Sequence, residues 1–157
     1  MRTCLILTVV LFFTGQLYAQ SPVLTKAELD SIYQVNIKLS KINGVYIPAN
    51  ITEAFLRLET LTPKDALDNF KNAEEKTVCK KLHFGIGRWM IINWNFYEGS
   101  RLSHYLKEKG LLHPDDMAQF LLRTFHRHLN GNDLEQKRIV DELAEARKKH
   151  AQELINN

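Results

Sequence analysis

Apolar residues recur along most of the chain every three or four positions, a spacing that places them on one face of an α-helix. No segment of useful length alternates between apolar and polar residues, which is the pattern typical of a half-buried β-strand. Residues that begin or end helices separate the apolar stretches. The pattern therefore predicts an all-α fold, a compact domain of several short helices.

The first predicted helix begins at Thr25. Thr25 with Glu28 three residues later has the sequence of a capping box. We expect Gly44 to end this helix. Residues 45–47 precede a proline and are expected to be extended, because a residue before proline avoids helical backbone.

Three further helices are predicted in the next part of the chain. Asn50, with Glu53 three residues later, marks one N-terminus. Thr62 followed by Pro63 marks another, with threonine as the N-cap residue and proline in the first helical position. A short helix is expected over residues 74–82.

Gly85 and Gly87 are expected to break the chain after this short helix. The segment Trp89 to Tyr97 is almost continuously apolar, so a helix here would be buried on most sides. We therefore expect a buried central helix near residues 88–97. A strand is the competing interpretation of so short an apolar run.

The last third of the chain predicts three more helices. Ser100 is the expected cap of a helix that Gly110 ends, and Pro114 opens the next one, which stops at residues 130–131. The segment 134–155 is long and highly charged, and its apolar residues form a narrow stripe. We expect this C-terminal helix to lie across the domain or to pair with a partner helix.

The N-terminus has the three-part layout of a secretory signal peptide. Arg2 supplies positive charge, residues 4–14 are uncharged and mostly apolar, and a more polar stretch ends at Ala19 before Gln20. This apolar run is shorter than the roughly 20 residues that a membrane-spanning helix needs. We expect cleavage after Ala19 and an exported protein, periplasmic or secreted, without a stable membrane anchor. An uncleaved anchor is the alternative.

These features divide the chain into four segments. We expect a signal peptide over residues 1–19 and an N-terminal helix with a connector over 20–46. A globular helical domain follows over 47–133, and a charged helix over 134–157. At 157 residues the chain has room for one such domain and not comfortably for two.

Charge and cysteine content narrow the function classes. Lys and Arg total 21 against 18 Asp and Glu, and the bases are scattered among acids, which argues against nucleic-acid binding. Removal of the signal peptide leaves Cys79 as the one cysteine, so no internal disulfide can form. Neighbouring lysines would make Cys79 reactive. The alternative is a buried structural thiol.

Polar groups that could take part in chemistry lie between His83 and Asn130. One group consists of Gly85, Gly87 and Arg88, which would suit the binding of an anion at a helix N-terminus. Alternatively, the two glycines permit a tight bend and Arg88 pairs with an acidic side chain. The group from His113 to Asp116 suggests a metal or acid–base site. Proline followed by two acids also builds an ordinary helix N-terminus.

The candidate polar site comprises eight of these groups. Two of them, Asn93 and Arg101, are alternatively expected in a buried polar network that fixes helix packing. The members of the candidate site are His83, Arg88, Asn93, Arg101, His113, Asp115, Asp116 and His126. No complete catalytic constellation, metal-ligand spacing or cofactor motif is present in the sequence. We therefore expect no metal and no cofactor.

A set of short motifs extends from His83 to Gly131. Its residues are His83, Gly85, Gly87, Arg88, Trp89, Asn93, Trp94, Ser100, Arg101, Leu102, Tyr105, His113, Pro114, Asp115, Asp116, Met117, His126, Arg127, Leu129, Asn130 and Gly131. In these motifs the chain resembles a family of uncharacterised bacterial domains of unknown function, associated mainly with Bacteroidetes. The resemblance covers residues 47–133 and departs from the family pattern at His128, where the family has an aromatic residue. It implies no particular activity.

The sequence thus favours an exported binding or interaction domain over an enzyme. We expect its partner to be another protein, bound through the C-terminal helix; an inhibitor of an exported toxin would be a special case. The alternative is a small enzyme or anion-binding protein that uses a polar cluster of Arg, His and Asp side chains.

Overall fold

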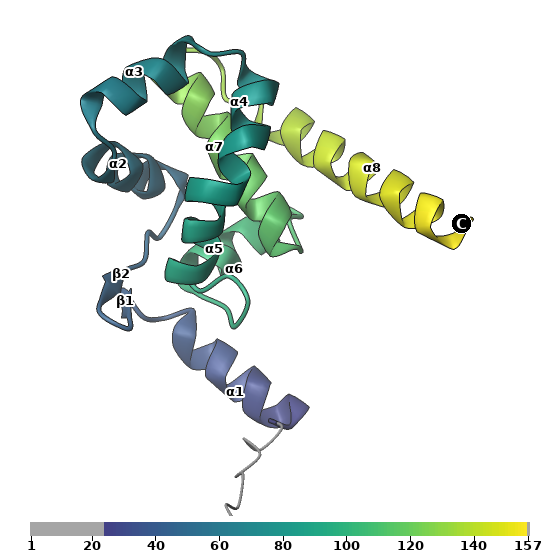
Figure 1. The fold of residues 1–157 in the computed structure, drawn as a ribbon. Coiled ribbons are helices and arrows are strands. Elements are labelled where there is room, and N and C mark those ends of the chain that lie inside the picture. The colour runs from purple at the N-terminus through teal and green to yellow at the C-terminus, as the bar shows by residue number, and fades with distance from the viewer. Residues whose placement is uncertain (1–23, 157) are drawn as a thin grey trace, which may run out of the picture.

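The computed structural model describes residues 24–156 (Figure 1), and the expected signal peptide lies outside them. The fold is all-α apart from one small hairpin, as predicted. In chain order the elements are α1 (Lys26–Asn36), β1 (Lys41–Ile42), β2 (Val45–Tyr46), α2 (Ile51–Leu61), α3 (Lys64–Asn72), α4 (Glu75–Leu82), the π-helical turn η1 (His83–Gly87), α5 (Arg88–Asn93), α6 (Arg101–Glu108), α7 (Pro114–Leu129) and α8 (Gln136–Ile155).

Several predicted helix boundaries are confirmed by hydrogen bonds. The Thr25 hydroxyl accepts from the backbone N–H of Glu28, whose carboxylate accepts from the Thr25 N–H at 2.7 Å. The Asn50 side chain caps α2, and the Ser100 side chain caps α6. Helices α6 and α7 end next to Gly110 and Gly131, as expected. Local sequence therefore determines these ends.

The prediction that Gly44 ends the first helix is wrong, because α1 stops at Asn36. Asn43 and Gly44 instead form the two-residue turn between β1 and β2, with φ values of 50° and 78°. Positive φ at both positions is the geometry of a type I′ turn, for which Asn-Gly is a preferred pair. The strands pair antiparallel with Lys41 opposite Tyr46, so the expected extended connector is half of a hairpin.

The predicted Thr62 cap of α3 is also wrong. Thr62 is the C-cap residue of α2, and α3 begins at Lys64 with Pro63 in the N-cap position and no capping side chain. Because α2 continues to Leu61, almost no chain is left between the two helices. Thr62 therefore closes the first helix and does not cap the second.

The expected chain break at Gly85 and Gly87 is wrong as well. Helix α4, η1 and α5 follow one another without interruption from Glu75 to Asn93. Cys79, His83 and Gly87 recur every four residues and all approach α7. Four residues advance an α-helix about 40° beyond a full turn. The wider π-helical turn takes up this drift and keeps the three positions on one face.

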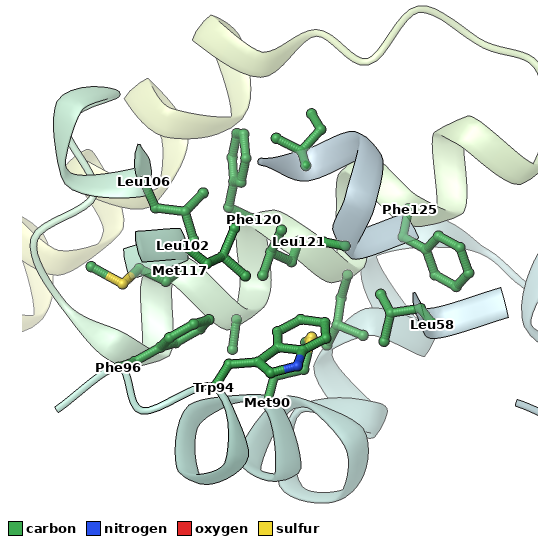
Figure 2. Close-up of a cluster of buried hydrophobic side chains, with 14 of the residues drawn as sticks. Leu58, Met90, Trp94, Phe96, Leu102, Leu106, Met117, Phe120, Leu121 and Phe125 are labelled. Carbon is green, nitrogen blue, oxygen red and sulfur yellow. The ribbon is translucent and has the colours of Figure 1, made fainter. Parts of the chain in front are cut away.

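Helix α7 lies at the centre of the core, and helices from both sides pack on it (Figure 1). Its buried side chains meet those of α2, α5, α6 and the turn after α5 (Figure 2). The expected buried helix near 88–97 ends at Asn93, and Ile92 and Tyr97 are 60% and 67% exposed. Because α5 lies outside α7, one of its sides faces solvent. The labelled core residues are Leu58, Met90, Trp94, Phe96, Leu102, Leu106, Met117, Phe120, Leu121 and Phe125.

Alanine substitutions at the two helical glycines, Gly85 and Gly87, should have opposite effects on the stability of the domain. A Cβ at Gly85 would have no neighbour within 4 Å, so Gly85→Ala should raise the free energy of unfolding by about 0.5–1 kcal/mol through helix propensity. A Cβ at Gly87 would lie 3.2 Å from His83 Nδ1 and 3.5 Å from Leu122 Cδ1. Gly87→Ala should therefore destabilise the domain in urea denaturation. Equal changes in the free energy of unfolding for the two substitutions would contradict the conclusion that Gly87 is crowded and Gly85 is not.

Candidate functional site

The structure brings two of the eight expected site residues into direct contact. His83 Nε2 lies 3.0 Å from Asp115 Oδ1, which links η1 to the first turn of α7. The His83 ring packs edge-on against Phe84, and its Nδ1 is buried without a hydrogen-bond partner among residues 24–156. The pair therefore joins two helices beside apolar surface.

Asp116 points away from this pair and binds α8. Its two carboxylate oxygens accept hydrogen bonds from Arg147 Nε at 2.6 Å and Nη2 at 2.8 Å. The hydrogen bond with Asp116 raises the pKa of Arg147 above its ordinary value. Successive helix residues point about 100° apart, which separates Asp115 from Asp116. Asp116 thus fastens α8 to α7.

Arg101 belongs to a partly buried polar network, as expected. Its Nε donates to the Ile47 carbonyl at 2.7 Å, its Nη2 lies 3.4 Å from Glu53 Oε2, and its guanidinium stacks over the Tyr46 ring. The backbone N–H of Ala49 lowers the pKa of Glu53, and the Tyr46 hydroxyl and Arg101 add to the effect. The network fastens the hairpin to α2 and α6.

The other expected site residues lie in separate environments. His126 is buried, with Nε2 2.9 Å from the Ala73 carbonyl. Asn93 donates to a carbonyl of its own helix one turn earlier and has no hydrogen bond to Arg101, so these two do not share a network. His113 is the exposed N-cap residue of α7, and Arg88 is exposed on α5. The expected cluster is therefore dispersed over the domain.

Sequence reasoning missed the most buried charged group. Arg123 of α7 is 6% exposed, and its guanidinium bonds to Glu75 of α4 and Glu142 of α8, each at 2.9 Å. Glu75 also accepts from Arg127 at 2.9 Å. An arginine directly after the apolar run from Phe120 to Leu122 was the available signal, since buried charges need partners. Its partners lie too far away in sequence to be identified.

Cys79 is a buried structural thiol and not a reactive one. It has no exposed surface, and burial raises its pKa to about 12, with the charge of Glu75 adding to the effect. The thiolate is the reactive form of cysteine. The neighbouring lysines do not offset burial, so the thiol stays protonated at neutral pH.

The part of the chain from 24 to 156 contains no group of three or more His, Cys, Asp or Glu side chains placed to hold a metal ion. No helix within that part is both long and apolar enough to cross a membrane.

Two surfaces with exposed apolar side chains are candidates for binding. The first, which we call the η1 groove, has a volume of about 460 Å³ and is lined by Leu61, Gly85, Ile86 and Trp89. The second is the outer end of α8, residues 148–155, where every residue is exposed. Figure 1 shows α8 projecting away from the other helices.

Comparison with protein families gives one match. A family model described as "Domain of unknown function (DUF6794)" matches residues 47–129, which lie within residues 47–133, where the resemblance to a family of unknown function was expected. Neither the curated proteins nor the solved structures provide a match. The matched region begins at the carbonyl that holds Arg101 and ends with α7, so α1 and α8 lie outside it.

The Arg123 network predicts a pH-dependent contribution to stability. Burial raises the pKa of Glu75, but hydrogen bonds from Arg123 and Arg127 outweigh it, and the net shift is downward from 4.5. A carboxyl group whose pKa is lower in the folded state stabilises the fold at pH values above its unfolded-state pKa. This stabilisation is lost as the pH falls through the folded-state pKa. Glu75→Gln should cost about 1–3 kcal/mol at pH 7.

The difference in stability between Glu75→Gln and wild type should shrink as the pH falls below 4.5, because the wild-type carboxyl becomes protonated. Thermal unfolding measured at a series of pH values from neutral into this acidic range checks the prediction. Glu145→Gln is the matched control, because that side chain is 79% exposed and should change stability little. A difference that stayed constant with pH would show that the charge of Glu75 is not responsible.

Proposed function

Since the chain belongs to the family described as domain of unknown function DUF6794, we propose that it is an exported helical binding domain whose partner is another protein. The outer end of α8 is the partner-binding segment. The observation that carries the proposal is the contrast between the two halves of this helix.

The inner half of α8 is fastened to the domain. Ile139 has no exposed surface, Glu142 pairs with Arg123, and Arg147 forms the two hydrogen bonds to Asp116. These contacts set the direction in which the helix leaves the domain. The rest of the helix therefore extends from a rigid base.

The outer half of α8 carries an apolar stripe without a partner in the described part of the chain. Leu154 and Ile155 are 68% and 83% exposed, and Ala151 lies on the same face. Short helices without tertiary contacts are only marginally stable in water. A partner helix laid along this stripe would bury the leucine and isoleucine and stabilise the last turns.

A groove beside α8 would provide a second contact surface for such a partner helix. It lies between α8 and the turn from Gly110 to His113, has a volume of about 280 Å³, and contains Leu112, which is 67% exposed. Amphipathic helices commonly bind in apolar grooves of this kind. The groove and the stripe together form one surface.

Binding is favoured over the alternative of a small enzyme or anion-binding protein. That alternative requires Arg88, Arg101, His113, Asp115, Asp116 and His126 to converge. Those of them that form hydrogen bonds or ion pairs do so with different residues on different elements. Nucleic acid is disfavoured because the basic residues are scattered among acids over most of the chain and form no continuous basic stripe.

Truncation of the chain after Lys148 tests the α8 proposal. It keeps Ile139, Glu142 and Arg147, so the melting temperature should change little, while partner binding should be lost. A photo-crosslinking amino acid at position 154, introduced in the producing cell, should yield a discrete adduct of higher mass. Leu154→Asp with the crosslinker at position 155 should abolish that adduct.

The matched control carries the crosslinker at Leu56, which is 58% exposed on α2. Equal adducts at positions 56 and 154 would show nonspecific contact and would refute the proposal. Deletion from residue 134 onward is unsuitable as a test, because it removes the buried Ile139 and the partner of Arg123. It would therefore unfold the domain for reasons unrelated to binding.

The export part of the proposal has its own measurement. N-terminal sequencing of the protein recovered from the periplasm or the culture medium should begin at Gln20. A protein that retains Met1 and stays in the cytoplasm would refute export without affecting the α8 experiment.

A further inference from the structure

Gly85 has no structural role within the domain. Its φ is not positive, and a Cβ there would have no neighbour within 4 Å. Glycine inside a helix is less stable than alanine, so the fold itself would prefer alanine at this position. Gly87, two residues later, is crowded by His83 and Leu122 and is explained by packing. Gly85 is instead suited to the close approach of something outside the domain.

Unpaired positive charges surround Gly85. Arg88 is exposed and has no hydrogen bond, ion pair or ring contact with any residue in 24–156. Lys80 and Lys81 are also exposed and form no ion pair within that part of the chain. Each of the other arginines described has a partner: Arg57, Arg101, Arg123, Arg127, Arg138 and Arg147.

The carboxylate at the start of this continuous helix, Glu75, pairs with Arg123 and Arg127, and residues 76–93 contain neither aspartate nor glutamate. Asp115 contacts the helix at His83, on the side that packs against α7. The side of the helix that carries Gly85 and Arg88 therefore attracts negative charge.

Apolar side chains on the same helix are exposed to an unusual degree. Phe84 is 80% exposed and Ile92 is 60% exposed, while Leu61 across the η1 groove is 48% exposed. The groove meets a smaller apolar cavity of about 190 Å³ at Ile86, which lines both. Exposed aromatic and arginine side chains around an apolar depression are typical of binding hot spots.

We infer that the η1 groove and its rim bind an acidic amphipathic helix of a partner protein. The apolar side of that helix would lie against Ile86 and Trp89, its backbone would pass close to Gly85, and its carboxylates would pair with Arg88 and Lys81. This site is separate from α8, lies within the family-matched region, and does not depend on the proposal for the α8 surface.

A concave surface suits a single helix better than a flat membrane. Strong binding to phosphate backbones requires more cations than the three found here. Charge complementarity and the groove together therefore favour a protein helix over a lipid bilayer or a nucleic acid.

A synthetic peptide tests this inference without knowledge of the natural partner. The probe is a fluorescent peptide of about 16 residues with leucine at helical spacing and glutamate at the other positions. Anisotropy titration against residues 20–157 should show saturable binding that weakens as salt is raised. The same peptide with lysine in place of glutamate should not bind.

Substitutions in the chain then locate the site. Arg88→Ala should weaken binding about threefold or more, and Arg88→Lys should weaken it less. Gly85→Ala should weaken binding about tenfold while raising the melting temperature by about 2–4 °C. A loss of binding in a stabilised protein excludes unfolding as its cause. Leu154→Ala, on α8, should leave peptide affinity unchanged.

Other outcomes would overturn the inference. Equal affinity for the acidic and basic peptides, or unchanged affinity in Gly85→Ala, would remove the η1 groove as the site. Binding to vesicles of phosphatidylglycerol and phosphatidylcholine, together with failure to bind the peptide, would identify an anionic membrane surface instead. Each result is distinct from failure of the α8 crosslinking experiment, which uses different residues.

Discussion

Arg123 carries a permanent charge in the interior of α7, where water cannot solvate it, and the arrangement of three helices follows from this requirement. Glu75 at the start of α4 and Glu142 in α8 converge on its guanidinium from two sides. A buried charge that loses a hydrogen-bond partner typically costs about 1–3 kcal/mol. The positions of α4 and α8 on α7 are therefore coupled through the pairing of this one guanidinium.

The features predicted correctly from the sequence are those that depend on a few neighbouring residues. Thr25, Asn50 and Ser100 cap the helices they were expected to cap, because each hydrogen bond spans three positions. The all-α class follows from apolar spacing in the same way. Errors arose where a short-range signal had two meanings. Gly44 was expected to end a helix and instead forms a hairpin turn with Asn43, and the helix continues through Gly85 and Gly87, which were expected to break it.

The dispersed placement of the candidate site residues could not be predicted, because it depends on contacts between distant segments. Asp115 and Asp116 are adjacent in sequence but contact η1 and α8 respectively, and spacing alone gives no indication of either partner. Arg88 and Gly85 were noticed for an anion site at a helix N-terminus. The continuous helix removes that N-terminus and leaves the same two residues on an exposed helical surface, which changes the ligand they suit.

The π-helical turn η1 also determines where this segment can vary in length. It accommodates one more residue than an α-helical turn of the same height. Deletion of one residue between His83 and Gly87 would let the turn close as an ordinary α-helical turn, so Met90 and Ile91 would keep their places in the core. Deletion of one residue within α4 or α5 would instead rotate the positions beyond it by about 100°. A homologue could therefore lack one residue of η1 and keep the same apolar pattern after position 87.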